Sequence, residues 1–189
     1  YQRDAGEIQI DGERVNPTSP RQAQLLGVSM MYQESNLVPE LTVSANIALG
    51  RESFVLNSHQ TEVRVSEILD RLDFHLDPSV KASHLSGAQM QMAEIAKALY
   101  EESKIIIMDE PTAALNIPET RALHKVIRDV SATGVSVIYI SHALEEALEI
   151  ADYVTVLRDG KVVACRETRA FTRRDLVELM VGRHISIIE

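Results

Sequence analysis

The sequence lacks the features that mark several large classes of protein. It has one cysteine, Cys165, in 189 residues, so an internal disulfide is excluded and a reducing compartment is favoured. No stretch approaches the roughly 18 unbroken apolar residues of a membrane helix, and no signal peptide is recognisable. With 19 basic against 28 acidic side chains, no cationic stripe is available, and we expect no nucleic acid partner. The 45% hydrophobic content predicts a soluble globular chain. Cys165 lies in the strand-like "KVVACRE", where we expect it to be buried and inert.

Glycine is scarce in a way that matters for nucleotide chemistry. None of the eight glycines forms the pattern GxxxxGK followed by Ser or Thr, whose amides and lysine hold phosphates. The only Gly-Lys pair, Gly160 and Lys161, lies in "LRDGKVVA" between two apolar segments and predicts a hairpin turn. The chain begins at Tyr1 with no initiator methionine, which leads us to expect that upstream sequence is missing.

The segments that are present alternate between strand-like and helix-like patterns. "IIIM" at 105–108 is apolar on both faces, which is typical of a parallel sheet covered by helices, and the alternation predicts a doubly wound α/β fold. Strands are expected at 6–12, 25–33, 105–108 and 135–140, a hairpin at 153–167, and helices at 45–52, 61–74, after Ser86, from Pro118, at 143–151 and at 173–182. The helix stripes are Val65, Ile68, Leu69 and Leu72; Met92, Ile95, Ala96 and Leu99; and Leu123, Val126, Ile127 and Val130.

Polar side chains follow three of the expected strands. Asp109 and Glu110 end the apolar run in "KIIIMDEPTAALN", Gln33 follows "VSMMY", and His142 follows "VSVIYIS". Ligands bind beyond the carboxyl ends of parallel strands, so these residues are expected along one edge of the sheet. Neighbouring strand residues point to opposite sides, so one carboxylate can hold magnesium while the other faces an attacking water. Taken singly, each is also explained as a turn or helix-entry residue.

A fourth feature is the start of the helix in "SHLSGAQMQMAEIAKALY". Ser86 and Gln89 have the spacing of a capping box, which predicts a helix beginning at residue 86 or 87. Gly87 and Ala88 leave the first amides uncrowded at the positive end of the helix dipole, which favours an anion. The alternative is a helix cap with no further role.

Together these motifs resemble the nucleotide-binding subunits of ABC transporters. "HLSGAQ" is similar to the LSGGQ signature, "IIIMDEPTAAL" to the Walker B segment, "MMYQE" to the Q-loop and "YISH" to the switch histidine, all in the same order. The resemblance covers the entire chain. "QMQMAEIAKAL", "NIALGRE" and "LMVGR" look most like bacterial monosaccharide importers of the ribose, galactose and xylose type, first cassette.

The resemblance implies a role for each motif. Asp109 would coordinate Mg²⁺, Glu110 would act as general base on the attacking water, and Gln33 would contact the metal and water while sensing the membrane subunit. His142 would contact the γ-phosphate. The signature residues Ser86, Gly87, Ala88 and Gln89 would contact ATP held by the opposite cassette of a head-to-tail pair.

The resemblance also implies a fold, cofactors, partners and a location. The fold is a P-loop NTPase (ABC cassette) parallel sheet flanked by helices, with a helical subdomain and an antiparallel β element. The chain would be one incomplete ABC ATPase domain: 1–33 and 103–170 the RecA-like α/β core, 34–102 the helical subdomain, and 171–189 a C-terminal helix and tail. ATP and Mg²⁺ would be cofactors. The partners would be transmembrane permease subunits and a second cassette. Residues 34–47 would form part of the groove that receives the permease. The location would be the cytoplasmic inner face of the bacterial membrane.

The sequence departs from the family pattern in three places. Ala88 replaces the usual second signature glycine, where a methyl could crowd the phosphate or disfavour a positive φ, and Asn116 replaces an acidic residue. The Walker A loop is absent. The aromatic residue that stacks on adenine, one central strand and the P-loop helix, which the family has in the same region, are absent as well. Two functions follow: a truncated ATP-hydrolysing subunit of a sugar importer, or a non-catalytic partner-binding module. The 189-residue chain alone is expected to be inactive.

Overall fold

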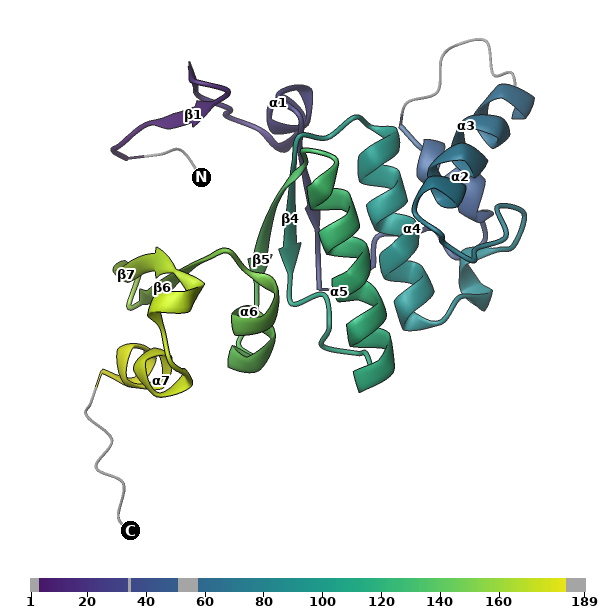
Figure 1. Cartoon of the computed structure of the whole chain (residues 1–189). Helices are drawn as coiled ribbons and strands as arrows, with labels where there is room; N and C mark the ends of the chain where they lie inside the picture. The colour runs from purple at the N-terminus through teal and green to yellow at the C-terminus, as the bar shows by residue number, and fades with distance from the viewer. Residues whose placement is uncertain (1–3, 34, 51–57, 183–189) are drawn as a thin grey trace. The chain divides into compact units, whose positions relative to one another are not determined.

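The computed structural model describes residues 4–33, 35–50 and 58–182, which fall into two compact units, Tyr1–Ile140 and Ser141–Glu189. The first contains β1 (Ile8–Ile10), β2 (Glu13–Val15), α1 (Pro20–Leu25), β3 (Val28–Met31), α2 (Val43–Ala48), α3 (Ser58–Arg71), α4 (Gly87–Tyr100), β4 (Ile105–Asp109), α5 (Ile117–Ala132) and β5 (Ser136–Ile140) (Figure 1). The second contains α6 (Leu144–Ile150), β6 (Tyr153–Arg158), β7 (Lys161–Glu167) and α7 (Arg173–Val181). Short 3₁₀ turns lie at Ala82–His84 and Thr168–Ala170.

A parallel sheet of three strands, in the order β3-β4-β5, forms the centre of the first unit. Met31 of β3 pairs with Met108 of β4, and Asp109 pairs with Ile140 of β5. The predicted parallel sheet is therefore confirmed. Its register brings the carboxyl ends of the three strands to a common edge.

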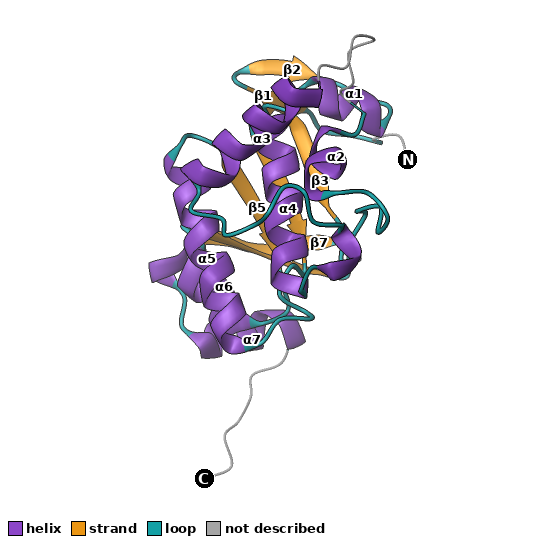
Figure 2. Cartoon of the chain, turned by 90° about the vertical axis from the view of Figure 1, so that its right-hand side faces the viewer, coloured by secondary structure: helices purple, strands orange, loops and turns teal. Residues whose placement is uncertain are grey.

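Helices α4 and α5 cover one face of this sheet (Figures 1 and 2). Beneath them Ile106 and Met108 are fully buried. On the opposite face the exposed fractions are 42% for Met30, 50% for Ile138 and 44% for Ile140. The predicted parallel sheet flanked by helices is confirmed, and on the face of Ile106 and Met108 the flanking helices are α4 and α5. An apolar strand sequence indicates where burial is favourable, but it does not supply the element that covers each face.

Helix α5 forms where its cap and apolar stripe predict it. Asn116 accepts a hydrogen bond from the backbone of Glu119, whose side chain bonds back to Asn116, and a proline lies in the first turn. All four predicted stripe residues, Leu123, Val126, Ile127 and Val130, are buried. Asn116 therefore retains the capping function that an acidic residue would also provide.

Helices α2, α3 and α4 pack against one another to form the helical part of the first unit. The α3 stripe is confirmed, since Val65 and Leu69 are buried, and α3 packs against α2, in which Ile47 is fully buried. In α4, Ile95 and Ala96 are both fully buried, and the small side chain of Ala96 allows a neighbouring helix to approach closely. Of the expected helix at 45–52, residues 51 and 52 lie outside the described residues.

Two hairpins turn at Asp-Gly pairs. Asp159 and Gly160, with φ of 51° and 72°, connect β6 to β7, and Asp11 and Gly12, with φ of 54° and 80°, connect β1 to β2. Positive φ at both positions is the type I′ geometry that matches strand twist. The β6–β7 hairpin is confirmed. Strand β2 and helix α1 were not predicted, although Ser19 and a following proline give α1 an N-terminal signal.

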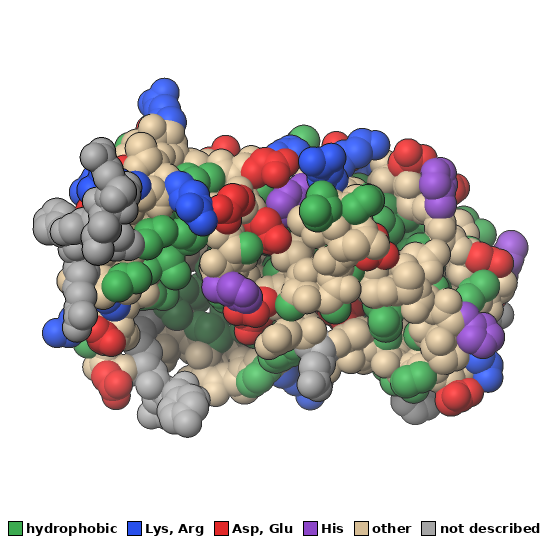
Figure 3. Space-filling view, turned by 90° about the horizontal axis from the view of Figure 1, so that it is seen from below, with side chains coloured by type: hydrophobic (Ala, Val, Ile, Leu, Met, Phe, Trp, Pro, Cys, Tyr) green, Lys and Arg blue, Asp and Glu red, His purple; other side chains and the backbone are tan. Residues whose placement is uncertain are grey.

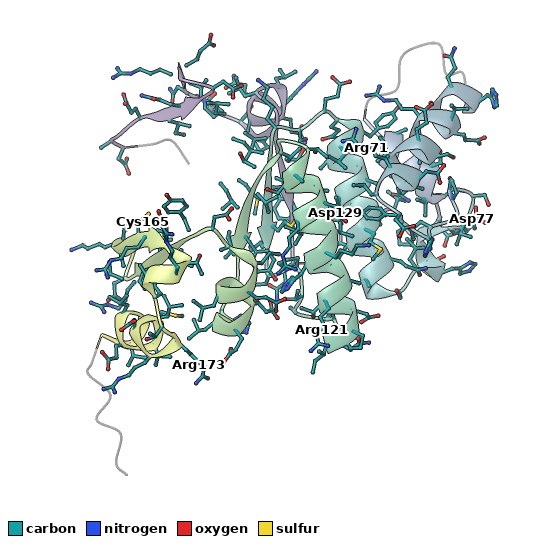
Figure 4. All side chains as sticks on the ribbon, viewed as in Figure 1. Arg71, Asp77, Arg121, Asp129, Cys165 and Arg173 are labelled. Atoms are coloured by element: carbon teal, nitrogen blue, oxygen red, sulfur yellow. The ribbon has the colours of Figure 1, made fainter. Side chains whose placement is uncertain are left out.

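The second unit has a small core of its own. Val156, Ala164, Phe171 and Leu176 are buried together, drawn from the hairpin, the turn after it and α7. The predicted burial of Cys165 is wrong, because its side chain is exposed on β7 (Figure 4). Strand alternation explains this, since buried Ala164 takes the inward position and its neighbour faces outward.

Helix α7 is confirmed and is capped at both ends. Thr172 and Asp175 form its capping box, and hydrogen bonds from the Thr172 backbone and side chain lower the pKa of the Asp175 carboxyl. Gly182 ends the helix with a φ of 75°.

The surface of the described residues is mixed in charge. On the face drawn in Figure 3, basic and acidic side chains are interspersed and no continuous basic patch is visible among the coloured residues. Of the helices within residues 4–33, 35–50 and 58–182, none combines the length and apolar character needed to cross a bilayer.

The two faces of the sheet predict different responses to truncation. Ile106→Ala should lower the free energy of unfolding by about 2–5 kcal/mol, because it opens a cavity under α4 and α5. Ile138→Ala, the matched control on the half-exposed face, should cost less than about 1 kcal/mol. Urea denaturation followed by circular dichroism measures both values. Equal losses would show that the face of Ile138 is also covered.

Candidate functional site

Three of the predicted site residues lie at the carboxyl edge of the parallel sheet. Asp109 is the last residue of β4, Glu110 follows it, and Gln33 is two residues beyond the end of the adjacent β3. Because Met31 and Met108 are paired, Gln33 is level in sequence register with Glu110. Gln33 is exposed and the two carboxylate residues are half-buried. The sheet topology thus brings these three residues to one edge.

Glu110 has an unusual backbone. Its N–H donates to the carbonyl of Ile140 at 2.9 Å, so it extends the hydrogen bonding between β4 and β5 by one residue. Its φ is +46°, in the left-handed region that is uncommon for a residue with a Cβ. Its carbonyl then accepts the N–H of Ala113 at 3.1 Å, which closes a turn. Strained backbone of this kind concentrates at functional sites.

A small polar cluster, missed in the sequence, lies behind this turn. The Tyr139 hydroxyl is 3.4 Å from Thr112 Oγ1 and 3.5 Å from His124 Nε2. The His124 and Tyr139 rings meet edge to face, with centroids 5.9 Å apart. Thr112 and His124 are both buried, so the cluster joins the turn after Glu110 to α5 and β5. The available signal was a histidine beside Leu123 on an apolar helix stripe.

The capping box at the start of α4 is confirmed. Ser86 Oγ accepts the Gln89 N–H at 3.3 Å, and Gln89 Oε1 accepts the Ser86 N–H at 2.9 Å. A Cβ at Gly87 would lie 3.4 Å from Leu115 Cδ2, so the helix start passes close to the segment that follows Glu110. Ala88 is helical and only 7% exposed, so this position needs no positive φ.

A groove runs beside the segment that follows Gln33. It encloses about 200 Å³ and is lined by Ser35, Leu37, Pro39, Ala82, Ser83, Leu85 and Met90. One wall is the loop after β3, and the other is the 3₁₀ turn leading to α4. The sequence prediction of a groove in this region agrees with this cavity, and its occupant stays a prediction.

His142 belongs to the second unit, two residues after the end of β5, and its side chain is exposed. The geometry of the first unit therefore brings together Gln33, Asp109 and Glu110 but not His142. The predicted role of His142 at the γ-phosphate stays a prediction.

The donor set suits magnesium held jointly with a nucleotide. Among the described residues, no group of three or more His, Cys, Asp and Glu side chains is placed to hold a metal alone. Mg²⁺ in nucleotide sites takes one or two carboxylates and completes its octahedron with phosphate oxygens and water. The Asp109 carboxylate and the Gln33 amide oxygen fit such a partial set.

Comparison with known proteins gives close relatives in sequence. The family described as "ABC transporter" matches residues 1–113. A putative ribose/galactose/methyl galactoside import ATP-binding protein 2 of Burkholderia cenocepacia is 44% identical over 98% of the chain. Ribose import ATP-binding protein RbsA 1 of Rubrobacter xylanophilus is 46% identical, also over 98% of the chain. The chain spans 37% and 38% of the length of these two relatives.

Solved structures support the same fold. An ATP-binding cassette of an ABC transporter in its ADP conformation aligns with a TM-score of 0.81 at 24% identity, covering 97% of this chain and 79% of that one. A dimeric ATP-binding cassette in a post-hydrolysis state, bound to ADP and Pi, aligns with a TM-score of 0.71 at 25% identity, covering 89% and 75%. With the parallel sheet, the carboxylate edge and the LSGAQ helix start, these matches show that the chain belongs to the ABC transporter family and has its ATP-binding cassette fold.

Proposed function

We propose that this chain is part of an ATP-hydrolysing subunit that powers sugar import by an ABC transporter. The observation that carries the proposal is the pair Asp109 and Glu110 at the carboxyl end of β4, with Glu110 fixed by the Ile140 carbonyl in a left-handed conformation. The relatives are named as ribose and galactose import ATP-binding proteins, which supports the substrate class.

The proposed chemistry is attack of water on the γ-phosphate of ATP. Mg²⁺, held by Asp109 and Gln33, would neutralise charge on the phosphate oxygens when nucleotide is bound. The Glu110 carboxylate would accept a proton from the water as its oxygen approaches phosphorus. His142 would donate a hydrogen bond to the γ-phosphate. Gln33 would orient the water through its side-chain amide.

A second cassette would complete the site. Ser86, Gly87, Ala88 and Gln89 would bind the γ-phosphate of ATP held by the partner cassette, with the hydroxyl and the free amides of the helix start as donors. The dimeric relative bound to ADP and Pi supports a paired arrangement. The buried Ala88 methyl supports tolerance of alanine at this signature position.

Permease subunits would dock in the groove beside residues 35–39. The groove is apolar along Leu37, Leu85 and Met90, which fits an amphipathic helix presented by a membrane protein. Docking there would hold the subunit at the cytoplasmic face of the bacterial membrane.

The 189-residue chain alone should bind MgATP only very weakly and show no turnover above background, because it carries no phosphate-binding loop. Isothermal titration and phosphate release measure the two quantities. Restoring upstream sequence with such a loop should recover hydrolysis. Micromolar binding that disappears in Asp109→Ala would contradict this expectation.

In the complete subunit, Glu110→Gln should lower the turnover rate by about 10²–10⁴-fold, since the amide cannot accept the water proton. Nucleotide should remain bound, which filter binding with labelled ATP would show. Glu67→Gln, an exposed change on α3, is the control and should leave turnover unchanged. A fully active Glu110→Gln subunit would remove Glu110 as the base.

Glycine substitutions test the backbone at this site. The left-handed conformation of Glu110 costs about 1–2 kcal/mol, which glycine avoids while adding about 0.5–1 kcal/mol of unfolded-state entropy. Glu110→Gly should therefore leave the unfolding free energy within about 1 kcal/mol. Asp109→Gly, in a regular strand, should cost about 1 kcal/mol or more. Urea denaturation compares them, and a larger loss for Glu110→Gly would argue against backbone strain.

A further inference from the structure

A buried carboxylate lies beneath the loop that forms one wall of the groove. Glu94, in the middle of α4, is only 7% exposed. Its Oε1 accepts the Ser35 hydroxyl at 2.7 Å and the Asn36 backbone N–H at 2.8 Å. Ser35 and Asn36 are two and three residues after Gln33. The side chain of one helix therefore fixes the loop that continues from the site.

The other end of this loop is fixed by a second buried polar side chain. Asn46 of α2 is 1% exposed, and its Oδ1 accepts the Val38 N–H at 2.7 Å. Its Nδ2 donates to the carbonyls of Val38 at 3.0 Å and Leu41 at 3.2 Å. Residues 35–38 are neither helix nor strand, so these side chains supply bonds that regular structure would otherwise provide.

Burying a carboxylate costs free energy unless it accepts hydrogen bonds. An apolar side chain at position 94 of α4 would be buried at lower cost. The position of Glu94 is better explained by what it holds than by stability. Glu94 is eight residues from Ser86, about 12 Å along a helix at 1.5 Å per residue. Over that length an α-helix moves as one body, so the loop at 35–36 and the signature start at Ser86 are connected through a rigid element.

We propose that Glu94 is a positioning residue that couples the groove to the signature motif. A permease helix seated in the groove presses on the wall formed by Ser35 and Leu37. The two bonds to Glu94 pass the displacement to α4, and α4 carries Ser86 and Gly87 with it. This proposal rests on the proposed function, since it assumes that the groove receives a permease and that α4 begins at a nucleotide contact.

The bonds themselves are tested on the 189-residue chain by amide hydrogen exchange. In Glu94→Ala the exchange rate of the Asn36 amide should rise about tenfold. In Glu94→Gln it should change less than about twofold, because the amide oxygen still accepts the bonds. Glu40→Ala, which removes an exposed ion pair to Lys81 at the neighbouring loop, is the matched control and should leave it unchanged.

Ser35→Ala removes one of the two bonds without altering α4, and should raise the Asn36 exchange rate about threefold. Ser35→Ala replaces Glu94→Ala as the test variant if Glu94→Ala does not fold. An Asn36 amide that exchanges at the wild-type rate in the folded Glu94→Ala chain, or in Ser35→Ala where only that variant folds, overturns the proposal.

Coupling is tested in the complete transporter, with the full-length ATPase and its permease in membrane vesicles. Glu94→Ala should lower the permease-stimulated turnover rate about tenfold, while KM for ATP changes less than about twofold. Ser35→Ala, used in its place, should also lower that rate. Glu94→Gln should restore stimulation. Unchanged stimulation with a released Asn36 amide overturns the coupling and leaves the proposed function intact. Absence of permease-stimulated hydrolysis in the wild type overturns both.

Discussion

The site depends on the parallel register of β3, β4 and β5. Burial of Ile106 and Met108 under α4 and α5 fixes β4, since a slip of one residue would turn both side chains to the opposite face. With that register set, Asp109 is aligned with Ile140, and Glu110 can bond to the Ile140 carbonyl. The position of the carboxylates is thus a consequence of apolar packing in the strand that precedes them.

Buried polar side chains then fix the loops that regular structure leaves free. Glu94 and Asn46 hold residues 35–38, and the cluster of Thr112, His124 and Tyr139 joins the turn after Glu110 to α5 and β5. Unpaired buried groups are costly, so each of these side chains selects a narrow range of loop conformations. Shape near the site is determined by few bonds, most of them between residues far apart in sequence.

The sequence predicted the elements whose signals are local. Stripes such as Leu123, Val126 and Ile127 predicted α5, the Ser86 and Gln89 pair predicted the start of α4, and "RDGK" predicted a turn. The rest depended on information that is not local. Burial of Cys165 depended on which face of β7 is covered, the hydrogen bonds of Glu94 depended on a loop 58 residues away, and the φ of Glu110 depended on a turn beyond the strand.

The same distinction explains why one face of the sheet is apolar yet exposed. Met30, Ile138 and Ile140 occupy positions that in a doubly wound sheet pack under helices, and α4 and α5 lie on the opposite face. A face that exposes three large apolar side chains favours a covering element, because burying apolar surface is worth about 25 cal/mol per Å². Asp109 is paired with Ile140 and so belongs to this exposed face, although the register of β4 is fixed from the covered face by Ile106 and Met108. The packing that sets the position of the carboxylate edge therefore lies on the covered side of the sheet, whereas Asp109 itself lies on the exposed side, beside Ile140.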